Sequence, residues 1–292
     1  WAALCLSFAL MVSWPAFAAD DAGPVQWRVE PVKTIQNCNV PECVVADAAN
    51  ALAYISNIES LPDEYWSDDG KGYISLMTAD GKMLKRRWLD STPDAVVHSP
   101  KGMCILNDTL YFTDNTRLLC RPLKPGGQLS EIPVPDAERL NDLASDKGLI
   151  YVTDTARGVI YKVVPDSKEV SVLKAPASVN GIAFHNGACF AVSWDLHEIF
   201  EIDLSGEAEP LPFGLATHFT NLDGIEILED GTFIVSDFVG NKIWAVGSDR
   251  KAIEPLAELE TPADIGLDRK RMLLYVPLFM KNEVAILRLK KE

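Results

Sequence analysis

The chain has 292 residues, of which 48% are hydrophobic and 18 each are Gly and Pro, a composition that argues against long disordered, collagen-like or coiled-coil segments. At roughly 100–200 residues per domain the length allows two domains, but a single β-barrel or propeller of this size is equally allowed. The 42 acidic and 27 basic residues leave a formal charge of −15. This charge argues against nucleic acid and anionic lipid surfaces as partners, because both would repel the protein.

The first 19 residues are uncharged, contain an apolar run over residues 2–12 and end in Ala16-Phe17-Ala18. This pattern predicts a signal peptide over residues 1–19 with an A-x-A cleavage site, and a buried N-terminal helix is the alternative. Because the stretch lacks an initiator Met and a basic region, we expect it to be truncated at its start. No other stretch approaches the roughly 20 apolar residues of a membrane span. We therefore expect an exported protein, periplasmic or secreted.

Removal of the signal peptide would leave an odd number of cysteines: Cys38, Cys43, Cys104, Cys120 and Cys189. At most two disulfides are then available in an oxidising compartment. The pairs nearest in sequence are Cys38/Cys43 and Cys104/Cys120, and buried free thiols are the alternative. None of the cysteines has the C-x-x-C spacing of a zinc site.

A short hydrophobic strand that ends in a hydroxyl residue, often followed by Asp or Asn, recurs along the chain. Its copies cover residues 52–57, 110–114, 150–154, 189–193, 233–237 and 274–277. With the hydroxyl residue as the anchor, or Pro277 in the last copy, successive copies stand 57, 40, 40, 43 and 41 residues apart. The longer first interval contains a polar stretch around Glu59–Lys71, which we expect to be an excursion between strands.

A second strand follows each anchor after turn residues, as a hairpin requires. These second strands lie at residues 72–76, 117–121, 159–163, 198–202, 242–246 and 283–287. With the apolar runs on either side, each unit of about 40 residues holds three to four short strands, which is typical of a β-propeller blade. The predicted fold is all-β: a single domain over residues 20–292, with six four-stranded antiparallel blades around a central channel. We expect a strand near Gln26–Ile35 to close the ring against the last blade, and a large β-sandwich is the alternative.

Each predicted innermost strand opens with a polar residue, 12 to 14 residues before its anchor: Glu42, Lys101, Asn141, Asn180, Asp223 and Asp264. Because the matching ends of the inner strands converge in a propeller, we expect these side chains to form a ring at one mouth of the channel. Crowded carboxylates raise one another's pKa unless a cation compensates. Oxygen ligands favour one divalent ion, Ca²⁺ first, with Mg²⁺, Mn²⁺ or Zn²⁺ as alternatives.

Other interpretations of these residues remain open. Asn-Gly and Asp-Gly are turn dipeptides in their own right. Lys101 either holds an anionic substrate group or oxyanion, or pairs with Glu42 or Asp264. His98 and His218 are proton-shuttle candidates or ordinary loop residues. Trp194-Asp195 and Phe238 directly follow their anchors, so we expect them at the opposite strand end from the ring, in packing or turns.

The chain lacks the motifs of serine hydrolases, zincins, P-loop nucleotide binding, calmodulin-type calcium binding and dinucleotide-dependent dehydrogenases. Its own motifs are Pro41-Glu42, Pro100-Lys101-Gly102, Leu140-Asn141-Asp142, Asn180-Gly181, Asp223-Gly224 and Ala263-Asp264. With these motifs the chain resembles an exported bacterial branch of the senescence marker protein/gluconolactonase (regucalcin-like) family of six-bladed propellers, which is related to paraoxonase-type lactonases and strictosidine synthase-like proteins.

The resemblance implies that Glu42, Asn180 and Asp223 bind a divalent metal, that Asn141 assists the substrate or metal, and that Asp223 is also the acid/base group. The chain departs from the family pattern in Cys43, where the enzymes commonly have Gly-Pro after the Glu, and in Arg139, a loose counterpart of a substrate-clamping Arg.

Two functions follow as hypotheses. The first is a metal-dependent hydrolase of a small cyclic ester, a sugar lactone or related lactone, with Asp223, Asn141 and Lys101 as its catalytic residues. The second is a binding propeller that holds a structural Ca²⁺ at the axis and a small ligand or protein partner on its loops. Metal-free chemistry of the strictosidine synthase type is a further alternative. Substrate identity and oligomeric state are left open.

Overall fold

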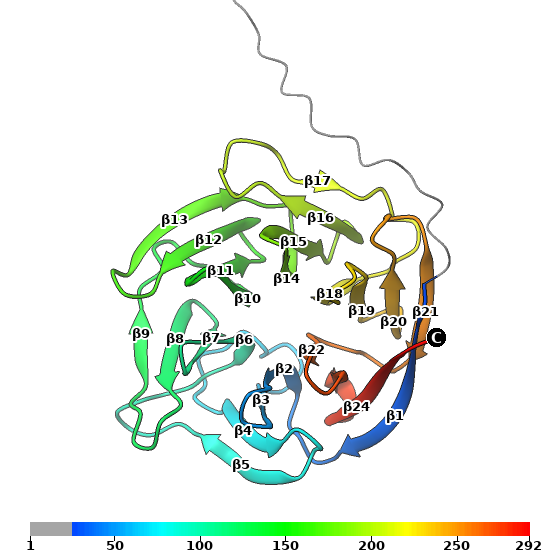
Figure 1. Ribbon diagram of the computed structural model, residues 1–292. Coiled ribbons are helices and arrows are strands. Elements are labelled where there is room, and N and C mark those ends of the chain that lie inside the picture. The colour runs from blue at the N-terminus through cyan, green and yellow to red at the C-terminus, as the bar shows by residue number, and fades with distance from the viewer. Residues whose placement is uncertain (1–24) are drawn as a thin grey trace, which may run out of the picture.

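Six antiparallel sheets of four strands each surround a central axis in the computed structural model, which describes residues 25–292 (Figure 1). The predicted signal peptide over residues 1–19 lies outside these residues. Blade 1 holds β2 (Pro41–Asp47), β3 (Leu52–Asn57), β4 (Tyr73–Thr78) and β5 (Met83–Leu89). Blade 2 holds β6 (Pro100–Leu106), β7 (Thr109–Asp114), β8 (Arg117–Pro122) and β9 (Ser130–Ile132). Blade 3 holds β10 (Leu140–Asp146), β11 (Leu149–Asp154), β12 (Val159–Val164) and β13 (Glu169–Lys174).

The last three blades repeat the same order from the axis outward. Blade 4 holds β14 (Val179–His185), β15 (Ala188–Ser193), β16 (Glu198–Ile202) and β17 (Leu211–Pro212). Blade 5 holds β18 (Leu222–Ile227), β19 (Phe233–Asp237), β20 (Lys242–Val246) and β21 (Ile253–Glu258). Blade 6 holds β22 (Gly266–Asp268), β23 (Leu273–Leu278) and β24 (Glu283–Lys291), with a 3-10 turn η1 (Phe279–Lys281) before β24. The predicted six-bladed propeller is confirmed.

The fourth strand of blade 6 comes from the other end of the chain. Strand β1 (Trp27–Ile35) pairs antiparallel with β24, from Trp27 opposite Lys291 to Ile35 opposite Val284. In Figure 1, β1 runs along the outer edge of blade 6 beside β24. The expected closure of the ring by a strand near residues 26–35 is therefore confirmed.

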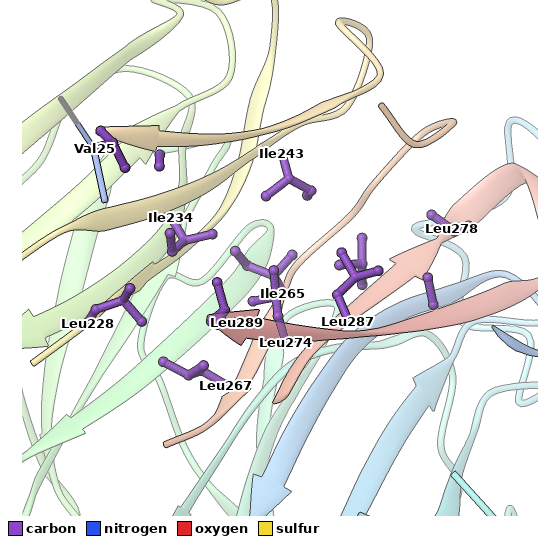
Figure 2. Packing of buried hydrophobic residues seen from close by; sticks show 13 residues of the cluster. Val25, Leu228, Ile234, Ile243, Ile265, Leu267, Leu274, Leu278, Leu287 and Leu289 are labelled. Atoms are coloured by element: carbon purple, nitrogen blue, oxygen red, sulfur yellow. The ribbon is translucent and has the colours of Figure 1, made fainter. Parts of the chain in front are cut away.

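The hydrophobic core is divided into layers between neighbouring blades. Alternation along each strand sends its side chains to both sides: on β11, Ile150 and Val152 pack toward blade 2, whereas Tyr151 packs toward blade 4. Figure 2 shows one such layer, in which Ile234 and Ile243 of blade 5 pack with Leu274 and Leu287 of blade 6. Each blade is thus held by burial against its two neighbours.

The cysteine pairs that the sequence suggested are not bonded, and all five described cysteines are free thiols. Cys104 and Cys120 both lie opposite Tyr111, on the two strands that flank β7. They are therefore two strand spacings apart, roughly 10 Å, which is too far for a disulfide. Cys38 and Cys43 pack in separate layers, on the two sides of blade 1.

None of the helical segments in residues 25–292 is long and apolar enough to cross a membrane.

Candidate metal centre

The inner strands begin with an irregularity that aims side chains at the axis. In β10 the pairing with β11 is interrupted between Leu140 and Leu143, so Asn141 and Asp142 lie outside the regular ladder. The same interruption occurs in β2, β6, β14 and β18. A bulge of this kind frees a backbone N–H and redirects side chains. The repeat therefore places the same polar position of each blade at the channel.

The recurring hydroxyl residues complete these bulges. Thr153 Oγ1 accepts a hydrogen bond from the Asp142 amide at 2.9 Å, and Ser236 Oγ accepts one from the Gly224 amide at 2.7 Å. Ser56 does the same for the Cys43 amide at 2.9 Å. In blade 4 the strand register puts Val192, not Ser193, at this position. The anchor that marks the repeat in sequence is thus a support for the axial ring.

The Asp after the anchor fixes the loop that leads to the ring. Asp154 accepts hydrogen bonds from the Glu138 amide at 2.8 Å and the Arg139 amide at 3.1 Å. Asp237 accepts the Thr220 amide at 3.0 Å and the Asn221 amide at 2.9 Å. Both carboxylates are fully or almost fully buried. These buried carboxylates hold the start of the inner strand of their own blade in place.

The structure brings the six predicted ring residues to the same end of the inner strands. All six are buried, with 3% to 7% of their surface exposed. Neighbouring blades touch here: the Asp264 amide donates to the Glu42 carbonyl at 3.0 Å. A Cβ on Gly181 would lie 2.5 Å from the Asp223 carbonyl oxygen. Only glycine permits so close an approach, which is why Asn180-Gly181 serves the axis and not merely a turn.

Three buried oxygens in this ring have no hydrogen-bond partner among the described residues: Glu42 Oε2, Asn141 Oδ1 and Asn180 Oδ1. A buried unpartnered acceptor is costly, by about 1–3 kcal/mol each, and such atoms call for an explanation such as an ion. No three His, Cys, Asp or Glu side chains within residues 25–292 converge to hold a metal by themselves. A cation in the ring would therefore need the two amide oxygens in addition to the carboxylates.

Burial raises the pKa of the ring carboxyls. The pKa of Asp223 rises to about 7 through desolvation and the charge of Asp142, against a lowering hydrogen bond with Asn180. The pKa of Glu42 is raised well above its usual range by burial and by the charge of Asp223, against the lowering effect of Lys101. A cation bound among these groups would favour their ionised forms.

Lys101 has all its donors occupied. Its Nζ donates to the carbonyls of Tyr65 at 2.9 Å and Ser99 at 3.1 Å and to Asn115 Oδ1 at 3.3 Å. The Trp66 ring covers the same ammonium, with its centroid 3.8 Å from Nζ. Burial lowers the pKa of Lys101 to about 8, although the charge of Glu42 opposes this shift. The side chain thus ties the segment between β3 and β4 to the mouth of the channel.

Asp142 is an axial residue with no role predicted from the sequence. Its Oδ2 accepts the Ile182 amide of the next blade at 2.8 Å, and it shares a hydrogen bond with Asp264 of blade 6, across the ring of blades. The pKa of Asp142 rises to about 7 because burial outweighs these hydrogen bonds. Below the pair the channel continues as a cavity of about 260 Å³, with Glu226 and Arg269 among its lining residues. The signal in sequence was the Asn-Asp pair itself.

Neither loop histidine reaches the ring through a hydrogen bond of its imidazole. His98 Nδ1 accepts the Gly70 amide at 3.0 Å, and His218 is exposed beside Phe219.

Trp194 and Phe238 lie in turns and pack together, as expected, but their expected position at the opposite strand end from the ring is wrong. Because β15 runs antiparallel to β14, Ser193 lies opposite Val179. Trp194, the residue after Ser193, therefore lies at the same end of the blade as Asn180. Phe238 lies beside the Asp223 end of β18 for the same reason.

No protein-family model matches the chain, and no curated protein is similar to it. Solved structures share its fold at low identity. A candidate gluconolactonase is 15% identical with a TM-score of 0.67, over 92% of this chain and 94% of its own. Virginiamycin B lyase from Staphylococcus aureus is 15% identical with a TM-score of 0.60, over 90% and 99%. A protein of unknown function from Bacteroides thetaiotaomicron is 12% identical with a TM-score of 0.67, over 90% and 76%.

These likenesses confirm the resemblance at the level of the fold. The six-bladed propeller of this chain superimposes on a candidate gluconolactonase and on virginiamycin B lyase over at least 90% of its length. Because one fold hosts several reactions, the chemistry must be argued from the site.

Proposed function

We propose that the protein is a divalent-cation-dependent hydrolase of a small cyclic ester, with its site in the axial ring. The three unpartnered buried oxygens of Glu42, Asn141 and Asn180 are the observation that carries this proposal. Together with the Asp223 carboxylate they form an oxygen-only donor set, which favours Ca²⁺, with Mg²⁺, Mn²⁺ or Zn²⁺ as alternatives. Glu42, Asn180 and Asp223 would hold the ion, and Asn141 would assist the substrate or the ion.

Asp223, Asn180 and Lys101 would have different roles in ester hydrolysis. When bound, a divalent ion would polarise the ester carbonyl as a Lewis acid. Asp223 would orient the attacking water and take its proton. Asn180, which hydrogen bonds to Asp223, would hold that carboxylate in place. Lys101 would act by positioning, because its three donors are already used.

Elemental analysis tests the ion site. Wild type and Asp223→Ala are equilibrated with Ca²⁺, Mg²⁺ or Zn²⁺ and freed of unbound ion. Asp166→Ala is the control, because Asp166 is an exposed carboxylate in the turn between β12 and β13, at the end of the blade away from the ring. We expect about one equivalent in wild type and the control and none in Asp223→Ala. A wild-type protein without bound ion would contradict the proposal.

A screen of lactones with and without chelator tests the reaction. The product of hydrolysis gains the mass of one water, whereas a lyase opens its ring by elimination and the mass is unchanged. Mass spectrometry of the product therefore separates the two activities of the structural neighbours.

The deep burial of the ring favours one other function, a binding propeller with a structural Ca²⁺. The ring side chains are at most 7% exposed, so an ion there would be enclosed by protein. A closed site that exchanges its ion slowly and opens no lactone would support this alternative.

A further inference from the structure

Five aromatic rings form an arc around the mouth of the channel: Trp194, Phe238, Phe279, Tyr65 and Trp66. We call this set the aromatic arc. Successive ring centroids are 5.3 Å apart for Trp194 and Phe238, 5.5 Å for Phe238 and Phe279, and 4.9 Å for Phe279 and Tyr65. Trp66 continues the arc to the cations of Lys101, at 3.8 Å, and Arg139, at 5.5 Å. Edge contacts of this kind hold aromatic side chains in a fixed arrangement.

Strand register places the arc next to the ring. The Trp194 amide bonds to the Ser178 carbonyl, and the Phe238 amide bonds to the Asn221 carbonyl. Each of these partners stands two residues before a ring residue, Asn180 or Asp223, so the aromatic side chains begin roughly 7 Å above the ring at a strand rise of roughly 3.3 Å per residue. A ligand held by the ring oxygens that extends toward this end of the channel therefore comes close to the arc.

The two halves of the mouth differ in polarity. The position of Trp194 in the repeat is filled by Phe238 and Phe279 in the next two blades, but by Asn115 and Thr155 in blades 2 and 3. The apolar half extends outward through exposed neighbours of the arc: Leu196 is 43% exposed, Val239 51% and Met280 53%. One side of the mouth thus offers apolar contact, whereas Asn115 and Thr155 on the other side are hydrogen bonded within the protein.

We propose that the mouth binds the apolar substituent of an amphiphilic cyclic ester, an alkyl or aryl group attached to the ester ring, against the aromatic arc. This inference rests on the proposed function for the ester group, whereas the contact with the substituent depends on the arc alone. A lactone with a chain of several carbons is the substrate class that fits both the polar ring and its apolar approach.

Calorimetry with lactams tests this inference without hydrolysis. The probes are δ-lactams with a methyl, butyl or octyl substituent, whose amide resists opening. In wild type we expect the affinity to rise about twofold to fourfold for each methylene that is buried on the arc. In Trp194→Ala and Phe238→Ala this dependence on chain length should be largely lost.

The controls separate the arc from folding and from catalysis. Phe238→Leu keeps apolar volume and should restore most of the dependence. Val239→Ser changes an exposed neighbour of the arc without disturbing the core, and it should weaken the dependence for the octyl lactam. Val172→Ser, 56% exposed on the outer strand β13, should bind the lactams as wild type does. Asp223→Ala should lose lactone opening but keep the dependence on chain length.

Two results in wild type would overturn the inference: lactam affinities that do not change with chain length, and a failure of every lactam to bind. An equal dependence on chain length in Trp194→Ala and Val172→Ser would also overturn it. A protein that shows the dependence but opens no lactone would instead refute the proposed function and leave the arc as a binding site.

Discussion

The hydroxyl of Tyr73 is buried without a hydrogen-bond partner among residues 25–292. Replacing Tyr73 by Phe removes this unpaired group and keeps the ring, so we expect the free energy of unfolding to rise by about 1 kcal/mol. Tyr161→Phe is the matched control, because Tyr161 is equally buried but its hydroxyl accepts from Arg157 at 3.2 Å. Urea denaturation should show a gain for Tyr73→Phe and a loss for Tyr161→Phe. Equal losses in both variants would contradict this account.

The same tyrosine predicts a pH dependence of stability. Burial raises the pKa of Tyr73 from 10.0 to about 12. The unfolded chain then releases the phenol proton at a lower pH than the folded protein does, so the contribution of Tyr73 to stability falls as pH rises from about 10 to about 12. The advantage of Tyr73→Phe over wild type should therefore grow across this range, as measured by denaturation at several pH values. An advantage that shrinks with rising pH would show the opposite shift.

Asp154, at the end of β11, is hydrogen bonded to the loop before β10, the inner strand of the same blade. Asp154→Ala would leave the amides of Glu138 and Arg139 without their side-chain acceptor, at a cost of about 3 kcal/mol. Asp166→Ala, an exposed position in the same blade, should change stability by no more than about 0.5 kcal/mol. Thermal unfolding of the two variants measures the difference, and similar midpoints would exclude the role assigned to Asp154.

At the level of the strand, the bulge and its hydroxyl act as a unit. Ser236→Ala would remove the acceptor of the Gly224 amide and loosen the bulge that aims Asp223. We expect a stability loss of about 1–2 kcal/mol together with weaker Ca²⁺ binding by calorimetry. Ser193→Ala is the control, because Ser193 bonds to the Ala177 carbonyl at 2.6 Å and supports no bulge. It should lose stability but keep its affinity for the ion; a parallel loss of affinity would argue against a specific role of the bulge.

The blades and the ring were predictable because both depend on regular spacing. Side chains such as Asn141 and Asn180 recur at a nearly constant number of residues before their anchors. Antiparallel hairpins of constant length therefore place them at equivalent positions in each blade. The position of Trp194 was misjudged, although antiparallel pairing already predicted it: β15 ends where β14 begins, so the residue after β15 lies near Asn180. Asp142 could not be assigned a role, since its partners Ile182 and Asp264 lie in other blades.

At the level of the whole molecule, β1 closes the ring by covering the edge of β24. A chain that begins at residue 36 would expose this edge, and open edges pair with other molecules. We expect such a chain to self-associate and to lose its single cooperative unfolding transition, by light scattering and calorimetry, whereas a chain that begins at residue 25 should stay monodisperse. A monodisperse shorter chain with an unchanged transition would show that β1 is dispensable.

The sharing of blade 6 between both ends of the chain (Figure 1) also sets the order of events during biosynthesis. Strand β1 leaves the ribosome before all the other described strands, yet its partner β24 is translated last. Early blades can fold as they emerge, but the circle stays open until translation ends. In a nascent chain β1 therefore has no partner strand until β24 has been made. In a circularly permuted gene that starts between two blades, β1 and β24 would be translated close together in time.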